Sequence, residues 1–210
     1  MIRSLIAQTK EKLAVYIDVD YLGKFLVLAI GLYGINYLCC GLVDPQGLLY
    51  SSLLDNHLNY VAAIRKSILY ASNGFNHFAG INSHVALPFE VRSEKGWYVF
   101  MWYPCIGLGL MSFWSAFVIA HRQRTAGKIA WTLAGIVALW VINVGRLSML
   151  MIAHERHWKL NSVIDHHTQN NLLSYALLLG MIMLYLRVNK KEIQQPFTRL
   201  PEATPGNLLL

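Results

Sequence analysis

Three side chains of this sequence could act together chemically: the thiol of Cys105, the guanidinium of Arg146 and the imidazole of His167. A thiolate is a nucleophile, a guanidinium is a permanent cation, and an imidazole gains and loses a proton near neutral pH. Each of the three stands at the end of an apolar stretch or inside one, and hydropathy places all three at one face of a membrane. The set predicts nucleophilic chemistry at that face.

Cys105 belongs to the sequence Tyr-Pro-Cys-Ile-Gly at 103–107. Pro104 suits the first position of a helix, which would put Cys105 at the positive end of the helix dipole, where a thiolate is favoured. Gly107 leaves room for a substrate backbone or a neighbouring helix. The alternative is a buried and inert thiol, because free cysteine is among the most buried residue types.

Arg146 stands inside an apolar stretch. A guanidinium at the centre of a membrane helix costs about 2.5 to 3.5 kcal/mol on insertion scales, so it normally faces a polar cavity or a partner. Asn143 lies one helical turn earlier, where it could orient the guanidinium or donate to a substrate carbonyl. The alternative is that Arg146 extends its side chain to the outer lipid headgroups.

His167 follows Asp165 and His166, directly before the last apolar stretch. An imidazole at this place can accept the thiol proton and return it to a leaving amine, and Asp165 could orient it. A polar turn that caps a helix is the alternative. The three cysteines match neither a zinc site nor a disulfide framework, and this chemistry needs no metal or other cofactor.

Composition indicates a membrane protein, since 55% of the 210 residues are hydrophobic and only 14% are charged. Four apolar stretches reach or approach the roughly 20 residues that a helix needs to cross the hydrocarbon core. They cover residues 23–43, 102–120, 129–149 and 171–188. The sequence therefore predicts an all-α integral membrane protein, a multi-pass helical bundle with at least four transmembrane helices.

Basic residues give this bundle an orientation. They gather ahead of the first apolar stretch, between the second and third, and after the fourth, which places both termini in the cytoplasm. Residues 1–22 then form a cytoplasmic amphipathic N-terminus, 23–188 a membrane catalytic domain and 189–210 a basic, flexible cytoplasmic tail. The three chemical groups face the outside of the inner (cytoplasmic) membrane. Because the net charge of +7 comes mainly from these anchors, nucleic acid is not an expected partner.

Residues 44–101 are less regular. An apolar helical face over 53–69 is interrupted by polar residues, so this part either lies on the outer surface or crosses the membrane imperfectly. Between Ser83 and Tyr103, alternating apolar and aromatic residues flank a polar turn at 92–96. This pattern predicts a small extracytoplasmic β-hairpin that leads into the candidate nucleophile.

These motifs resemble the exosortase/archaeosortase family, which consists of multi-pass membrane cysteine transpeptidases. Members carry a cysteine in a Cys-x-Gly context, an arginine in an Asn-x-x-Arg context and a later histidine, all near the outer face. The matching residues are Cys105 with Gly107, Asn143 with Arg146, and His167. Each motif alone is weak, but their order and shared topology over roughly 85–185 are fairly specific.

The surroundings of the histidine favour His167 over His166. Family members often have a small or amide residue four positions after the histidine and an aromatic residue about four later, and Asn171 and Tyr175 fit. Ile106 departs from the family, in which a small or polar residue often follows the cysteine. This departure bears on substrate preference more than on the nucleophile.

The resemblance implies both substrates and mechanism. Substrates would be exported proteins with a C-terminal sorting signal, made of a short motif, a transmembrane helix and a basic cluster. Cys105 would attack the scissile carbonyl, Arg146 would stabilise the oxyanion or position the thiolate, and His167 would serve as acid and base. Membrane lipid surrounds the enzyme, and an amine or glycolipid at the surface would accept the acyl group. Water in that role would make the reaction simple proteolysis.

Two other classes of protein remain open. His154 and His157, together with Asp165, His166 and His167, could form an outer metal site of a membrane hydrolase or transporter component. The sequence lacks a His-Glu-x-x-His signature, and Arg146 would repel a cation. In the second class, a non-catalytic membrane scaffold, Arg146 pairs with a carboxylate of a partner and Cys105 only packs.

Overall fold

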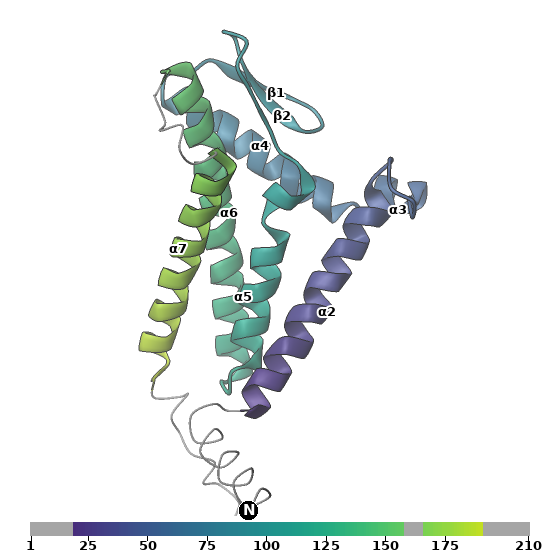
Figure 1. Cartoon of the computed structure of the whole chain (residues 1–210), viewed down its shortest axis with the longest axis vertical. Coiled ribbons are helices and arrows are strands. Elements are labelled where there is room, and N and C mark those ends of the chain that lie inside the picture. Colours follow the sequence, from purple (N-terminus) through teal and green to yellow (C-terminus); the bar gives the residue numbers. More distant parts are fainter. Residues whose placement is uncertain (1–18, 158–165, 191–210) are drawn as a thin grey trace, which may run out of the picture.

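The computed structural model describes residues 19–157 and 166–190, a part of the chain that is mostly helical (Figure 1). Its elements are α2 (Val19–Val43), α3 (Ser52–His57), α4 (Tyr60–Phe78), β1 (Ser83–Ala86), β2 (Glu90–Ser93), β3 (Tyr98–Phe100), the 3-10 helix η1 (Tyr103–Ile106), α5 (Leu108–Ala120), α6 (Thr125–Glu155) and α7 (His166–Val188). Three short strands therefore accompany the predicted helices.

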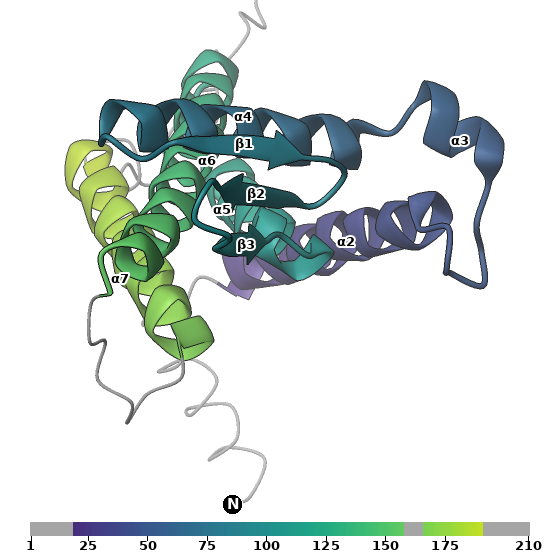
Figure 2. The ribbon, with the colours of Figure 1, turned by 90° about the horizontal axis from the view of Figure 1, so that it is seen from above.

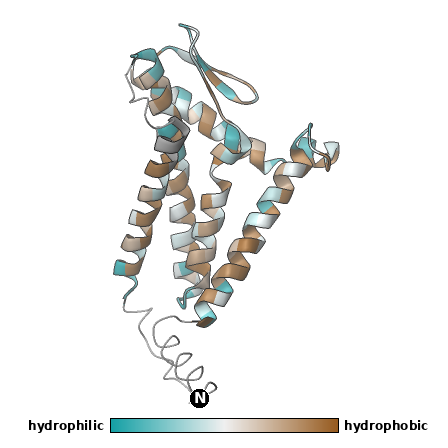
Figure 3. Cartoon of the chain, viewed as in Figure 1, coloured by the Kyte–Doolittle hydropathy of each residue, from teal (hydrophilic) through white to brown (hydrophobic). Residues whose placement is uncertain are grey.

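Four helices run side by side. Helix α2 packs along α5, α5 along α6, and α7 along α6 (Figure 1). Hydrophobic residues cover most of their length, as Figure 3 shows. Two of them, α2 with 25 residues and α6 with 31, are long and apolar enough to cross a membrane. The other two are an α5 of 13 residues and an α7 of 23 residues.

The segment predicted as a continuous helix over 102–120 is divided. Helix α5 begins only at Leu108, because Gly107 has a left-handed backbone (φ 84°) that separates it from η1. Thirteen residues extend about 20 Å, which is less than the roughly 30 Å of a hydrocarbon core. Helix α2 begins at Val19, four residues before the apolar stretch predicted over 23–43. Helix α7 ends at Val188, at the end of the apolar stretch predicted over 171–188.

Helix α4 lies across one end of this bundle and packs on α6 (Figures 1 and 2). Its inward face carries both apolar and polar side chains. The buried residues are Val61, Arg65, Ile68, Leu69, Ser72 and Asn76. Two arrangements were predicted for residues 44–101, a helix on the surface or an imperfect crossing. Helix α4 covers the end of the bundle and does not run alongside the other helices (Figures 1 and 2), which corresponds to the first arrangement.

A three-stranded antiparallel sheet lies beside α4, in the order β1-β2-β3 (Figure 2). Strands β2 and β3 form the predicted hairpin, with Arg92 opposite Tyr98. The alternating pattern predicted one continuous strand before the polar turn at 92–96. The structure instead has two strands there, β1 and β2. Strand β1 ends at Ala86, two residues before Pro88, because proline lacks the N–H that a ladder requires. The chain then turns, and β1 pairs with β2 as a third strand.

The end of α6 holds this sheet in place. Glu155 accepts a hydrogen bond from the Ser93 hydroxyl at 3.0 Å and pairs with the Lys95 ammonium at 3.3 Å. The ring of Trp97 stacks on His154 with 5.5 Å between centroids. Because β3 leads directly into η1, these contacts also fix the direction from which the chain approaches Cys105.

Candidate functional site

Cys105 lies in η1, one residue after Pro104, which occupies the first turn of that helix. The thiol is half-buried, and the backbone N–H of Cys105 donates to the carbonyl of Trp102 at 2.9 Å. The sequence predicted Cys105 in the first turn of the long apolar helix, but α5 begins three residues later. The 3-10 turn and Gly107 account for this difference, so α5 does not contain the thiol in its first turn.

Arg146 supplies the positive charge beside the thiol. Its Nη2 lies 3.8 Å from the Sγ of Cys105, although the two residues are 41 positions apart in the sequence. Arg146 belongs to α6, which packs along α5, and its side chain is half-buried. A guanidinium at this distance can donate a hydrogen bond to an oxyanion that forms next to the sulfur.

Asn143 binds the backbone at the connection between η1 and α5. Its side chain is only 5% exposed, and its Nδ2 donates to the carbonyl of Ile106 at 2.8 Å. The sequence suggested that Asn143 orients Arg146 or binds substrate, whereas its described hydrogen bond is to the backbone beside Cys105. Asn143 therefore positions the segment that contains Cys105 on α6.

Gly107 allows this close approach. Its φ of 84° is rarely adopted by other residues, and a methyl group at this position would overlap Nδ2 of Asn143. The glycine predicted to leave room for a substrate or a helix thus leaves room for the Asn143 amide.

Replacing Gly107 with alanine is therefore expected to destabilise the protein by about 1 to 2 kcal/mol for the backbone alone, and by more if Asn143 loses its bond to Ile106. Gly145→Ala is the matched control, since a methyl there meets nothing within 4 Å. Thermal unfolding of both variants in detergent tests this prediction. Equal unfolding temperatures of the two variants would contradict the close contact between Gly107 and Asn143.

The thiol and the guanidinium line a small pocket of about 30 Å³. Its wall consists of Phe100, Met101, Cys105, Asn143, Arg146, Leu147 and Leu150. This volume suits one water molecule or a group of similar size, such as a carbonyl oxygen. The mostly apolar wall keeps the local dielectric low, which strengthens any interaction between the guanidinium and a developing negative charge.

His166 and His167 are the first two residues of α7, which packs along α6 (Figure 1). The positions of their side chains are outside what the structure describes, and so is Asp165. The structure thus brings together Cys105, Asn143, Gly107 and Arg146 among the predicted residues. The predicted roles of His167, His166 and Asp165 stay predictions.

Within residues 19–157 and 166–190, no three His, Cys, Asp or Glu residues are grouped as metal ligands. His154 and His157, suggested above as metal ligands, both contact the indole ring of Trp97. The remaining members of that suggested cluster lie outside the described side chains.

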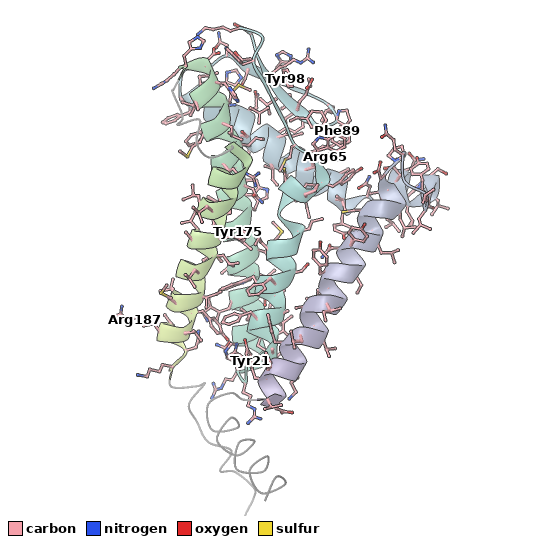
Figure 4. The ribbon with its side chains drawn as sticks, in the orientation of Figure 1. Tyr21, Arg65, Phe89, Tyr98, Tyr175 and Arg187 are labelled. Atoms are coloured by element: carbon pink, nitrogen blue, oxygen red, sulfur yellow. The ribbon has the colours of Figure 1, made fainter. Side chains whose placement is uncertain are left out.

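One charged residue was missed by the sequence reasoning. Arg65 is buried on the inner face of α4, with its guanidinium over the ring of Phe89 (Figure 4). The sequence pattern treated Arg65 as an interruption of an apolar face. The sequence did contain a signal for the burial of Arg65. The residue lies four residues after Val61 and three before Ile68, so it shares a helix face with these two apolar residues, both of which are fully buried.

Comparison with known proteins adds no relative: no protein-family model, curated protein or solved structure matches this chain.

Proposed function

We propose that the protein is a membrane-embedded cysteine peptidase of the transpeptidase type, similar to the exosortase/archaeosortase family. The observation that carries the proposal is the 3.8 Å separation between Arg146 Nη2 and Cys105 Sγ. An inert packing cysteine has no need of a guanidinium, and an arginine that extends to lipid headgroups would not be directed at a thiol. The contact favours the chemical interpretation of both residues.

The proposed setting is the inner membrane, with several crossings, both termini in the cytoplasm and the site outside. The lengths and hydropathy of α2 and α6 support crossing by these two helices. The basic segment that follows α5, which contains Arg122, Arg124 and Lys128, supports a cytoplasmic loop there. Cys105 precedes α5 and Arg146 lies in the second half of α6, so both belong to the opposite end of the bundle.

Acylation is the first chemical step of this proposal. His167 takes the proton from the Cys105 thiol, and the sulfur attacks the scissile carbonyl carbon. The carbonyl oxygen becomes an oxyanion that accepts a hydrogen bond from Arg146. The C–N bond then breaks, His167 gives its proton to the leaving amine, and a thioester joins the substrate to Cys105.

Deacylation follows with a second nucleophile. An amine at the outer surface gives a proton to His167 and attacks the thioester carbonyl, which expels the Cys105 thiolate and forms a new amide. Water in place of the amine releases a free carboxylate instead. The substrates are exported proteins whose C-terminal signal contains a short motif, a membrane helix and a basic cluster.

Trapping the thioester tests this proposal. The protein is expressed in its native cells with a candidate substrate, an exported protein that carries the C-terminal sorting signal (a tail-bearing protein). The membranes are quenched in acid, and the purified protein is digested for mass spectrometry. We expect a substrate fragment on the peptide that contains Cys105, removable by hydroxylamine and absent from Cys105→Ala. A substrate that is cleaved without a Cys105 adduct in any quenched sample would count against covalent catalysis.

A further inference from the structure

A buried cation in α4 has no ionic partner among the described residues. The side chain of Arg65 is 4% exposed, and its Nε and Nη1 have no hydrogen-bond acceptor. Aromatic rings provide its contacts, with the guanidinium carbon 4.0 Å from the ring centre of Phe89 and 5.1 Å from that of Tyr103. Rings stabilise a cation, but they leave its N–H groups unsatisfied, which is costly in a buried place.

Arg65 lines a pocket of about 260 Å³, separate from the one that contains Cys105. The end of α2 with the loop after it, helix α3, the start of α4, the turn between β1 and β2 and the start of η1 form its wall. The lining residues are Val43, Asp44, Pro45, Gln46, Asp55, Asn59, Arg65, Pro88, Phe89, Trp102 and Tyr103. This volume is far larger than a water molecule and suits a polar headgroup.

Two carboxylates, both half-buried, line the same pocket as the buried cation. Asp55 accepts hydrogen bonds from the Tyr50 hydroxyl at 3.1 Å and from Asn59 Nδ2 at 2.6 Å. Asp44 accepts one from the backbone N–H of Gln46 at 3.1 Å. The hydrogen bond to Asp55 raises the pKa of Tyr50, so this phenol stays protonated as a donor. Neither carboxylate forms an ion pair with Arg65.

The charge pattern is therefore one cation with free donors and two carboxylates, which together are net negative. A simple anion would satisfy Arg65 but would be repelled by Asp44 and Asp55. A ligand that carries an anionic group and an ammonium group a few bonds apart satisfies both parts of the pocket. A phosphate joined through two carbons to a primary ammonium has this arrangement.

The pocket also lies where an apolar helix ends. Val43 is the last residue of α2, and Asp44 follows it directly. The loop beyond exposes Leu48, Leu49 and Tyr50, which combine two apolar side chains with an aromatic residue typical of membrane interfaces. If α2 crosses the membrane as proposed, Asp44 and Arg65 lie at the depth of the outer headgroups. This depth favours a lipid over a water-borne peptide.

We propose that the Arg65 pocket binds the headgroup of an aminophospholipid, with the phosphate on the Arg65 guanidinium and the ammonium between Asp44 and Asp55. The proposal depends on the membrane setting described above but not on the chemistry of Cys105. It assigns a ligand to a site that the proposed peptidase reaction does not use.

Lipid retention by the full-length protein tests this assignment. Detergent-purified protein is mixed with equal amounts of phosphatidylethanolamine, phosphatidylcholine and phosphatidylglycerol, and bound lipid is counted by native mass spectrometry. We expect one retained phosphatidylethanolamine, preferred about tenfold over each of the others, because a charge-assisted hydrogen bond is worth about that factor. Choline lacks ammonium hydrogens, and glycerol lacks the cation.

Variants separate the two halves of the pocket. Arg65→Met should lose the retained lipid, and Asp44→Asn with Asp55→Asn should lose the preference for phosphatidylethanolamine over phosphatidylglycerol. Lys66→Met is the matched control, because Lys66 is exposed and adjacent on α4. Arg65→Lys keeps the charge, so reduced retention in a variant that unfolds at the wild-type temperature separates lost binding from lost folding. Cys105→Ala should retain lipid normally even if it processes no substrate.

Two results would overturn the lipid assignment. The first is equal retention of all three lipids, or retention that survives Arg65→Met in folded protein. The second is saturable binding of a short glutamate-containing peptide in the absence of lipid, lost in Arg65→Met and kept in Lys66→Met, which would assign the pocket to a polypeptide carboxylate.

Discussion

Cells that carry Cys105→Ala are expected to accumulate uncut, membrane-retained precursors of tail-bearing exported proteins, with cleavage reduced at least about a thousandfold. The thiolate forms the covalent bond in the proposed reaction, and alanine offers no replacement nucleophile. The protein itself should reach normal levels, because Cys105 is only half-buried and alanine is a slightly smaller side chain. Substrate size and location, compared at matched membrane levels of the two forms, provide the measurement.

Cys40→Ala is the matched control for this experiment. Cys40, in α2, is another half-buried free thiol that packs against the hydrophobic core as Cys105 does, whereas the described contact with Arg146 is made by Cys105. Its replacement should leave processing intact. Normal cleavage of every candidate by Cys105→Ala would remove the catalytic role of Cys105 and favour the scaffold alternative, in which this thiol only packs.

Helix positions were predictable from hydropathy because long apolar stretches have few other folded arrangements. Residues 23–43 and 129–149 lie inside α2 and α6, and 171–188 lies inside α7. The start of the second stretch was not predictable in the same way. Hydropathy averages over many residues, whereas the break before α5 depends on the backbone of one residue, Gly107, and on its contact with Asn143.

The pairing of Cys105 with Arg146 was predictable in outline, since both residues were assigned to one end of the bundle. Their 3.8 Å separation was not, because it depends on how α5 and α6 are packed. Trp114 contributes to that packing. Its indole fills the space left by Gly135 and donates to the carbonyl of Trp131 at 3.0 Å, and no local sequence pattern relates these three residues.

The role of Asn143 shows a further limit of sequence reasoning. An amide one turn before an arginine has several possible partners, among them the guanidinium, a substrate and a neighbouring backbone. Only the tertiary structure, which brings Ile106 to within 2.8 Å of its nitrogen, selects the last of these. Arg65 was overlooked for a related reason, since the rings of Phe89 and Tyr103 that contact it come from distant segments.

Arg146→Met is expected to slow substrate cleavage about 100- to 1,000-fold, the usual effect of removing one donor to a developing oxyanion. Arg146→Lys should retain part of the activity, because an ammonium keeps the charge but lacks the planar array of donors. Arg187→Met is the control, since Arg187 lies exposed in the last turn of α7, at the far end of the bundle from η1 (Figure 4). Its replacement should change neither activity nor abundance.

A second measurement distinguishes chemistry from anchoring. In Arg146→Met the reaction of Cys105 with iodoacetamide at neutral pH should slow about tenfold, because the guanidinium that contacts the sulfur is gone. An arginine that serves only to reach lipid headgroups would leave alkylation of Cys105 unchanged while lowering the amount of protein in the membrane. Slower alkylation at normal abundance would thus connect the 3.8 Å contact to the reactivity of the thiol. Unchanged alkylation would leave the pair without a chemical role.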